Sequence, residues 1–439
     1  MVTDVTKDTT DVGNYFIANY PPFSFWKKDH LAAIEQAFAS PPQSSAPLGL
    51  YLHIPFCRKR CKFCYFRVYT DVNAPVIQQY VDSLAKEIGI LAKKPAVQGR
   101  EFHFVYFGGG TPSYLAVKQL HGLVGKLREH IDWDKAEEVT FECEPGTLQE
   151  AKVHAFREIG VTRLSLGVEN FSDAVLEENG RAHLSPEVYR CWEWIKKAGF
   201  SQVNIDLIAG MVGETWENWK ENIRKTIELD PDSVTIYQME LPYNTKYAKD
   251  LQILGETQVA NWSTKRDWVD YAFGTLGEAG YSVSSAYTMV KKKSSRESSF
   301  LYRDALWHGA DLLCAGVASF GHLSGIHYQN IDGLENYEAM LAEDKLPLGR
   351  ALPTSADERL IREMILQMKV GSLDASYFRR KFNREIFHEF SSQFNRLTSE
   401  GLADIDGDRL SLKREGLLRV DSLLPAFFLP EHTSTDRYT

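Results

Sequence analysis

The sequence predicts an α/β fold, an incomplete TIM-like barrel of six strand–helix units followed by a small α+β module. Between residues 50 and 239, short runs of β-branched and aromatic residues alternate with longer helical patterns. Parallel strands need a long crossover connection, usually a helix, between one strand and the next. Alternation of strands and helices therefore predicts a parallel sheet. After residue 245 the alternation ends, and the last part of the chain has helical periodicity followed by a hairpin pattern.

An N-terminal arm and the barrel come first. Residues 1–46 are expected to form an arm rich in aromatic side chains, which ends in a Pro- and Ser-containing linker. The barrel is expected at 47–245. Its predicted strands lie at 50–54, 103–107, 138–142, 163–168, 202–208 and 233–239, and its predicted helices at 75–91, 113–130, 148–158, 185–198 and 215–229.

Two further parts follow the barrel. Residues 246–350 are expected to extend it, with a helix at 259–279, a strand at 281–289 and a Gly-rich segment that returns to the barrel mouth. At residues 351–439 the sequence predicts a winged-helix-like module of three helices and a hairpin. The hairpin is expected because Asp406-Gly407 separates two runs in which apolar and polar residues alternate. Balanced charges favour a packing or lid role for this module over DNA binding.

Composition narrows the classes of function. The chain has 439 residues, a net charge of −9 and a pI near 5.8, which argues against general nucleic-acid binding. No apolar run is long enough to span a membrane, and the start lacks a secretory pattern. Six cysteines are too few for a disulfide framework in a chain of this size. We therefore expect a cytoplasmic, monomeric protein that acts on a small molecule.

Three cysteines carry the strongest chemical signal. Cys57, Cys61 and Cys64 follow the first predicted strand with the spacing C-x3-C-x2-C. Three thiolates on one loop can bind three irons of a [4Fe–4S] cluster and leave the fourth open for chemistry, whereas ordinary ferredoxin clusters use four cysteines. Zinc is the alternative, but structural zinc sites usually take four ligands, and His53 is the only further candidate nearby.

A glycine triplet at 108–110 follows the second predicted strand and precedes Thr111-Pro-Ser113. Glycines let a ligand approach the bare backbone, and free N–H groups at such a turn attract carboxylates or phosphates. Because the C-terminal ends of parallel strands meet at one face of a barrel, this loop is expected beside the cysteine loop. The sequence therefore predicts a cofactor site there.

Taken together, these motifs resemble those of radical S-adenosylmethionine (SAM) enzymes, and more narrowly the oxygen-independent coproporphyrinogen III oxidase-like family. The resemblance covers roughly residues 48–330 and is carried by residues 51–64, 108–112, 141–145, 163–171 and 203–208. It implies a [4Fe–4S] cluster on the three cysteines, cleavage of SAM to a 5′-deoxyadenosyl radical, and a tetrapyrrole or similar conjugated substrate of porphyrin or heme metabolism.

The resemblance also implies individual contacts. SAM at the cluster is expected to touch Tyr51, Gly109, Glu142 and Phe320, and a second SAM to touch Phe63, Gly110, Thr111, Glu169, Arg181 and Asp206. Chemically, the carboxylate of Glu142 suits the amino group of SAM, and Arg181 suits a carboxylate through two parallel hydrogen bonds. Asp206 suits a ribose hydroxyl.

Three departures from the family pattern leave alternatives open. Tyr65-Phe66 replaces a further cysteine, Glu169 stands where glutamine is usual, and only Trp307 remains of a heme-trafficking motif. One alternative resembles radical SAM C-methyltransferases, which use two SAM molecules on an sp2 carbon. Another is a heme-binding chaperone that keeps the cluster.

Two surfaces are predicted at the barrel mouth. Substrate contacts are expected from Tyr237, Gln238 and Glu240, at the end of the sixth strand. The basic residues around the cysteine loop favour acidic substrate groups, an acidic reducing partner such as flavodoxin or ferredoxin, or an ordinary solvated surface. They are Arg58, Lys59, Arg60, Lys62 and Arg67.

Overall fold

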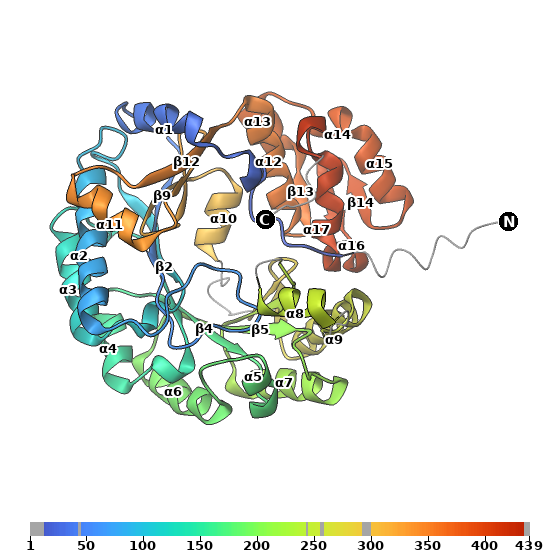
Figure 1. The fold of residues 1–439 in the computed structure, drawn as a ribbon. Coiled ribbons are helices and arrows are strands. Elements are labelled where there is room, and N and C mark those ends of the chain that lie inside the picture. Colours follow the sequence, from blue (N-terminus) through green and yellow to red (C-terminus); the bar gives the residue numbers. More distant parts are fainter. Residues whose placement is uncertain (1–12, 43–44, 243–244, 255–258, 292–299, 434–439) are drawn as a thin grey trace.

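The computed structural model describes residues 13–42, 45–242, 245–254, 259–291 and 300–433. Six parallel strands pair side by side in chain order. Figure 1 shows the sheet curving into an open ring with helices around its outside, which confirms the incomplete barrel. The strands are β1 (Leu48–Ile54), β2 (Phe102–Gly109), β3 (Glu138–Cys143), β4 (Arg163–Glu169), β5 (Gln202–Ala209) and β6 (Ser233–Gln238).

Helices connect the successive strands and bury their apolar stripes against the sheet. Several begin at a residue whose side chain accepts a hydrogen bond from the N–H three positions later, as Asn73, Ser172 and Thr215 do. These caps explain where the helices start. The helices are α2 (Ala74–Leu91), α3 (Val117–Arg128), α4 (Glu150–Glu158), α5 (Asp173–Glu178), α6 (Ser185–Ala198) and α7 (Trp216–Leu229).

The sheet is larger than predicted, because further strands extend it at both edges. The segment predicted as one strand at 281–289 is instead a hairpin, in which Ser284 N–H donates to Thr288 O at 2.8 Å. The predicted helix at 259–279 is confirmed as α9 (Trp262–Glu278). The added strands are β7 (Tyr281–Val283) and β8 (Thr288–Lys291) beside β6, and β9 (Asp311–Ala315), β10 (Phe320–Leu323), β11 (Ile326–Asn330) and β12 (Leu348–Pro353) beside β1.

The C-terminal module combines helices with a three-stranded antiparallel sheet. Its hairpin turns where the sequence predicted, since Asp406 pairs with Arg409 and Gly407 has a φ of +56°. Within the part of the chain that the structure describes, no helix could cross a membrane. The module's main elements are α12 (Ala356–Met368), β13 (Ser372–Asp374), α13 (Ala375–Phe382), α15 (Ser391–Ser399), β14 (Ala403–Asp406), β15 (Arg409–Leu412), α16 (Arg414–Leu418) and α17 (Val420–Leu423).

The N-terminal arm is bound to this module through a buried ion pair. Lys369 and Asp421 lie 2.7 Å apart, and both side chains are completely buried. The backbone of the arm adds to the pair, because Ile17 N–H donates to Asp421 at 2.9 Å and Ile17 O accepts from Lys369 at 2.5 Å. Tyr287, between β7 and β8, donates its hydroxyl to the same aspartate. The arm, the sheet edge and the module therefore meet at one charge pair.

Asp421→Asn is expected to lower the free energy of unfolding by about 3–5 kcal/mol, because it leaves the Lys369 ammonium buried without its counter-charge. Urea denaturation followed by circular dichroism measures this. The exposed pair between Lys413 and Asp404, also in the module, is the control, and Asp404→Ala should cost less than about 1 kcal/mol. Equal effects of the two substitutions would contradict a special role for the buried pair.

Candidate functional site

A cavity of about 470 Å³ opens at the C-terminal ends of the parallel strands. The cysteine loop after β1 and the glycine loop after β2 line it, together with side chains from the ends of β3 to β6. Every site residue predicted from the sequence lines this cavity except Tyr51 and Phe320. The structure therefore brings together motifs that lie up to about 180 residues apart along the chain.

The cysteine loop is held by backbone and side-chain hydrogen bonds. Cys57 N–H donates to Tyr69 O at 3.1 Å, and Lys62 N–H donates to Asn179 O at 3.0 Å. Two donors also reach the sulfurs: Thr111 Oγ1 lies 3.3 Å from Cys57 Sγ, and Arg181 lies 3.4 Å from Cys61 Sγ. Donors to sulfur stabilise thiolate, the form that binds iron.

The three thiols are free and only partly exposed. Burial raises the pKa of Cys57 to about 12 and that of Cys64 to about 11, so thiolate at these positions requires a strongly positive partner. In the described residues no three His, Cys, Asp or Glu side chains are grouped to bind a single metal ion. The fit of the site to an iron cluster rests on the shared cavity and the sulfur-directed donors.

Gly110 sets how closely the two loops approach. A Cβ atom there would lie 2.9 Å from the carbonyl carbon of Pro55 and 3.1 Å from Cys57 Sγ, so only glycine fits. The N–H groups of this turn are not free, contrary to the sequence-based expectation: Gly109 N–H donates to Glu142 at 3.1 Å and Gly110 N–H to Ile54 O at 2.8 Å. The turn therefore positions the cysteine loop and Glu142.

Glu142, at the end of β3, is the carboxylate fixed by that turn. Tyr106 Oη donates to its other oxygen at 2.7 Å, and burial raises the pKa of Glu142 to about 7. The ring of Tyr51 stacks on the ring of Tyr106, with the two ring centroids 5.9 Å apart. Phe320 packs on Phe23 at 4.5 Å. Tyr51 thus supports the ring that holds Glu142, and Phe320 lies outside the cavity lining.

Arg181 and Glu169 form a second charged group in the cavity, 3.6 Å apart. Arg181 also donates to Gly167 O at 2.7 Å, while its buried Nε has no hydrogen-bond partner among the described residues. Glu169 has a φ of +64°, and burial raises its pKa to about 7. Asp206 accepts from Ser165 Oγ at 2.8 Å and makes no ion pair with a described residue. The interior therefore carries more carboxylates than cations, which suits a positively charged ligand.

The sequence analysis did not single out Glu144 or His183. Glu144 accepts hydrogen bonds from His183 at 3.1 Å and from Arg58 at 3.3 Å. Burial raises its pKa, but the hydrogen bond and the nearby positive charges outweigh burial and lower it to about 2. Arg58 also donates to Ala182 O at 2.5 Å. Glu144 lies within residues 141–145, one of the segments that carry the family resemblance, but nothing in the sequence indicates that His183 is its partner.

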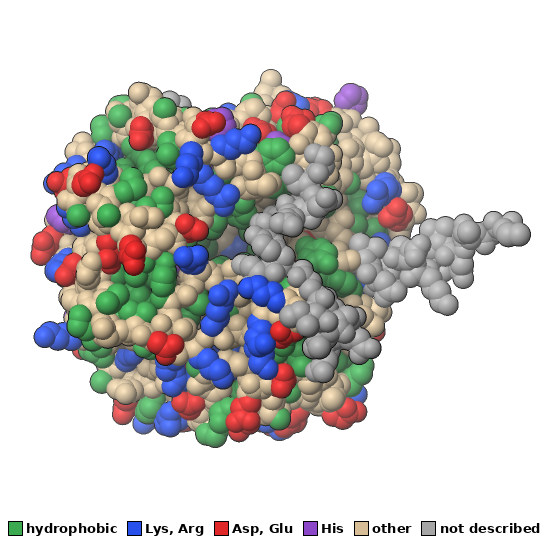
Figure 2. All heavy atoms as spheres, viewed as in Figure 1, with side chains coloured by type: hydrophobic (Ala, Val, Ile, Leu, Met, Phe, Trp, Pro, Cys, Tyr) green, Lys and Arg blue, Asp and Glu red, His purple; other side chains and the backbone are tan. Residues whose placement is uncertain are grey.

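The basic residues around the cysteine loop are largely engaged within the protein. Arg60 donates to Cys64 O at 3.1 Å, and Lys62 pairs with Glu178 at 2.8 Å. Figure 2 shows Lys and Arg side chains gathered around the hollow in the middle of this face. Arg60 and Lys62 therefore bind the cysteine loop to neighbouring parts of the protein. A reducing partner at this surface stays a prediction.

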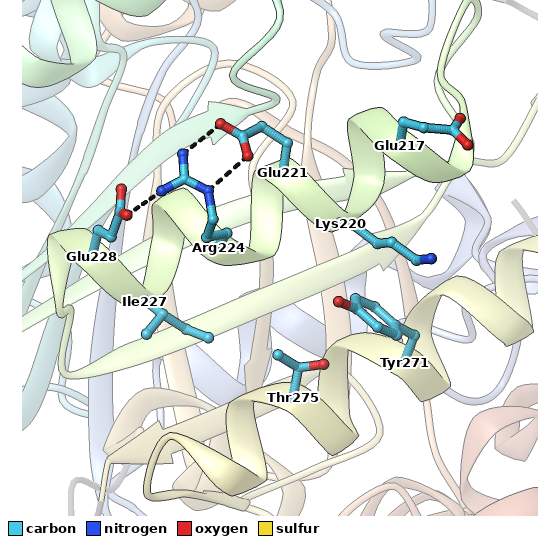
Figure 3. A pocket seen from close by; sticks show the side chains of 8 residues that line it. All are labelled: Glu217, Lys220, Glu221, Arg224, Ile227, Glu228, Tyr271 and Thr275. Carbon is cyan, nitrogen blue, oxygen red and sulfur yellow. Dashed lines mark hydrogen bonds and ion pairs between the residues drawn. The ribbon is translucent and has the colours of Figure 1, made fainter.

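A second hollow lies on the outside of the ring, between α7 and α9 (Figure 3). Its charged side chains pair with one another along α7, where Arg224 binds Glu221 at 2.6 Å and also contacts Glu228. Figure 3 shows Lys220 and Tyr271 at the other end of this groove. None of its residues carries a predicted role, so the cavity at the strand ends remains the candidate site.

Gly110→Ala is expected to displace the cysteine loop and to lower the iron bound after anaerobic reconstitution severalfold, because the added methyl overlaps backbone rather than a movable side chain. Iron and sulfide content per chain measure this. Gly122→Ala in α3 is the matched control: a Cβ there meets nothing within 4 Å, so iron loading should be unchanged. Full iron loading of the Gly110 variant would contradict the interpretation.

Comparison with known proteins agrees with this geometry. A family model described as the radical SAM superfamily matches residues 51–226. The heme chaperone HemW of Lactococcus lactis is 28% identical over 386 residues, which cover 88% of this chain and 98% of that protein. The oxygen-independent coproporphyrinogen III oxidase of Synechocystis is 25% identical over 429 residues, covering 93% and 91% of the two chains.

Among solved structures, the coproporphyrinogen III oxidase HemN of Escherichia coli, described as a radical SAM enzyme, has a similar fold. Its TM-score is 0.81 at 24% identity, and the match covers 94% of this chain and 96% of that one. The similarity therefore includes the N-terminal arm and the C-terminal module as well as the barrel.

Proposed function

We propose, from the premise that residues 51–226 form a radical SAM domain, that this chain is an enzyme that cleaves SAM and acts on a tetrapyrrole or a similar flat conjugated substrate. The cofactors of such a domain are a [4Fe–4S] cluster and SAM. When bound, they supply one electron and a 5′-deoxyadenosyl radical that removes a hydrogen atom from the substrate. The single observation that carries the proposal is the cavity that joins the three cysteines to Glu142, Arg181 and Asp206.

The chain's own residues have binding and orienting roles in this proposal. Cys57, Cys61 and Cys64 hold the cluster, and Thr111 and Arg181 donate to two of their sulfurs. Glu142 takes the amino group of SAM, because its carboxylate is already oriented by Tyr106 and by Gly109 N–H. Partial burial of these groups limits the access of water, which strengthens each charged contact.

The cavity also supports a flat substrate. Tyr65 and Phe66 lie with ring centroids 4.5 Å apart at its rim, and Tyr237 lines it from the end of β6. Aromatic side chains of this kind suit stacking against a conjugated ring. Relatives named for coproporphyrinogen oxidation and for heme handling match nearly the whole chain, which favours a tetrapyrrole.

A heme chaperone is the second candidate, favoured by the match to almost the full length of HemW. The segment of this chain that corresponds to the heme-trafficking motif packs within the protein, which favours a structural role for it over heme delivery. It forms α10 (Leu301–Trp307), in which Trp307 is buried and Tyr302 packs on Tyr106 with centroids 4.4 Å apart. Tyr302 therefore supports Tyr106, which lines the cavity, and Trp307 belongs to the hydrophobic core.

Reconstituted, reduced protein is expected to convert SAM to 5′-deoxyadenosine, and Cys57→Ala, Cys61→Ala or Cys64→Ala should abolish this product together with the cluster. Chromatography of the products and iron analysis measure both. Cys191→Ala is the matched control, because Cys191 is a buried free thiol on α6 that does not line the cavity. It should keep cluster and activity.

The products also separate the candidate functions. Carbon dioxide from coproporphyrinogen III indicates the oxidase, whereas S-adenosylhomocysteine beside 5′-deoxyadenosine indicates methyl transfer. Tight heme binding with no SAM cleavage by a fully loaded protein would reject the enzyme and leave the chaperone.

Glu142→Gln is expected to weaken SAM binding by about 10–100-fold, the usual effect of losing a charged hydrogen bond. The pKa of Glu142 is raised to about 7, so its carboxylate forms as the pH rises through 7. Wild-type affinity for SAM should therefore increase from pH 6 to pH 8, and the variant should lose most of that increase. Equilibrium dialysis of the cluster-loaded protein measures it. An unchanged pH profile in the variant would assign the titration to another group.

A further inference from the structure

The end of β6 presents hydrogen-bond acceptors to the cavity. Gln238 is the last residue of β6 and Glu240 lies two residues beyond it, and both line the cavity, five strands away from the strand that precedes the cysteine loop. Met239 between them also lines the cavity and packs with Val175, Ile208 and Met211, which adds apolar surface beside the two acceptors. The two acceptors therefore face one cavity.

The amide of Gln238 is oriented by the C-terminal module. Its Nε2 donates to Leu418 O at 3.2 Å, which directs the carbonyl oxygen the other way. That oxygen, Oε1, is buried and has no hydrogen-bond partner among the described residues. A buried acceptor without a partner is costly, so such an atom in a ligand cavity indicates a donor that arrives with the ligand.

Glu240 is fixed by the N-terminal arm in a similar way. One oxygen accepts from Phe16 N–H at 2.6 Å, and no described cation forms an ion pair with the carboxylate. Burial raises the pKa of Glu240 and the charges of Lys265 and Lys369 lower it, but both ammonium groups are bound to other partners. Lys265 donates to Met239 O at 2.6 Å, and Lys369 pairs with Asp421. On balance the pKa of Glu240 is raised to about 7, as expected for a carboxylate that lacks a counter-ion.

Three aromatic side chains share the cavity with this acceptor pair. Phe16, Tyr65 and Tyr237 line the same cavity. Burial raises the pKa of Tyr65, and the charge of the Glu240 carboxylate raises it further. A flat ring that stacks on these side chains would carry its polar head to Gln238 and Glu240.

We propose that the end of β6 binds an N–H donor of the substrate, an ammonium or a pyrrole-type N–H, and that it rejects a carboxylate. A donor satisfies both the Gln238 carbonyl and the Glu240 carboxylate. A substrate carboxylate would face these acceptors and the other interior carboxylates, and Arg181 already pairs with Glu169. The assignment rests on the proposed function, since it names the group by which that substrate is recognised.

Two probes with the same ring and opposite heads test the assignment: tryptamine, an ammonium, and 3-indolepropionate, a carboxylate. Both are methylated at the indole nitrogen, so that neither ring carries an N–H and the ammonium is the one N–H donor compared. Cluster-loaded protein saturated with SAM is titrated with each probe, and binding is followed by ligand-observed NMR. Tryptamine is expected to bind at least about tenfold more tightly than 3-indolepropionate. Glu240→Gln should reduce that preference to less than about threefold, while keeping the bond from Phe16 N–H through its amide oxygen.

Three comparisons keep the result interpretable. Glu240→Asp retains the charge and should retain the preference for tryptamine. Glu217→Gln, in the groove outside the ring, should behave as the wild type and controls for general surface charge. Iron content and the thermal midpoint show that each variant is folded and loaded.

Equal or tighter binding of 3-indolepropionate, a preference that survives in Glu240→Gln, or no binding of either probe at about 10 mM would each overturn the assignment. The proposed function fails by a different route, the absence of 5′-deoxyadenosine from SAM without any probe. The two failures are therefore distinguishable.

Discussion

The contact between Gly110 and the cysteine loop is the constraint on which the rest of the site depends. The loop can reach the ends of the parallel strands only because position 110 has no side chain. That approach places Cys57 beside Thr111, and the neighbouring Gly109 N–H orients Glu142. One steric condition thus sets both the sulfur side and the carboxylate side of the cavity.

Charge distribution gives the cavity its chemical preference. Glu142, Glu169 and Asp206 are partly buried there, and Arg181 lies 3.6 Å from Glu169. Desolvation raises the pKa of each carboxyl group, so a positive ligand that enters gains more than it would in water. A sulfonium cofactor with a free amino group has the charge that this arrangement requires.

The barrel and the other segments divide the work between them. The parallel strands and the loops that follow them supply most of the cavity lining, whereas the N-terminal arm and the C-terminal module orient the acceptors at the end of β6. The buried pair of Lys369 and Asp421 joins those two segments. Related chains with the same barrel can therefore differ in substrate through segments outside it.

The sequence by itself determined the fold class and the cysteine and glycine loops, because strand–helix periodicity and motif spacing are local properties of the chain. Most of the other cavity-lining residues came from the family resemblance. Only the tertiary structure decided which polar groups are free. It showed that the N–H groups of Gly109 and Gly110, at the end of β2, already donate hydrogen bonds within the protein. It also showed that Arg58 binds Glu144 and that the ring of Tyr51 stacks on Tyr106. Such pairs join residues far apart in the chain, and their partners depend on strand register and side-chain packing, which no local pattern encodes.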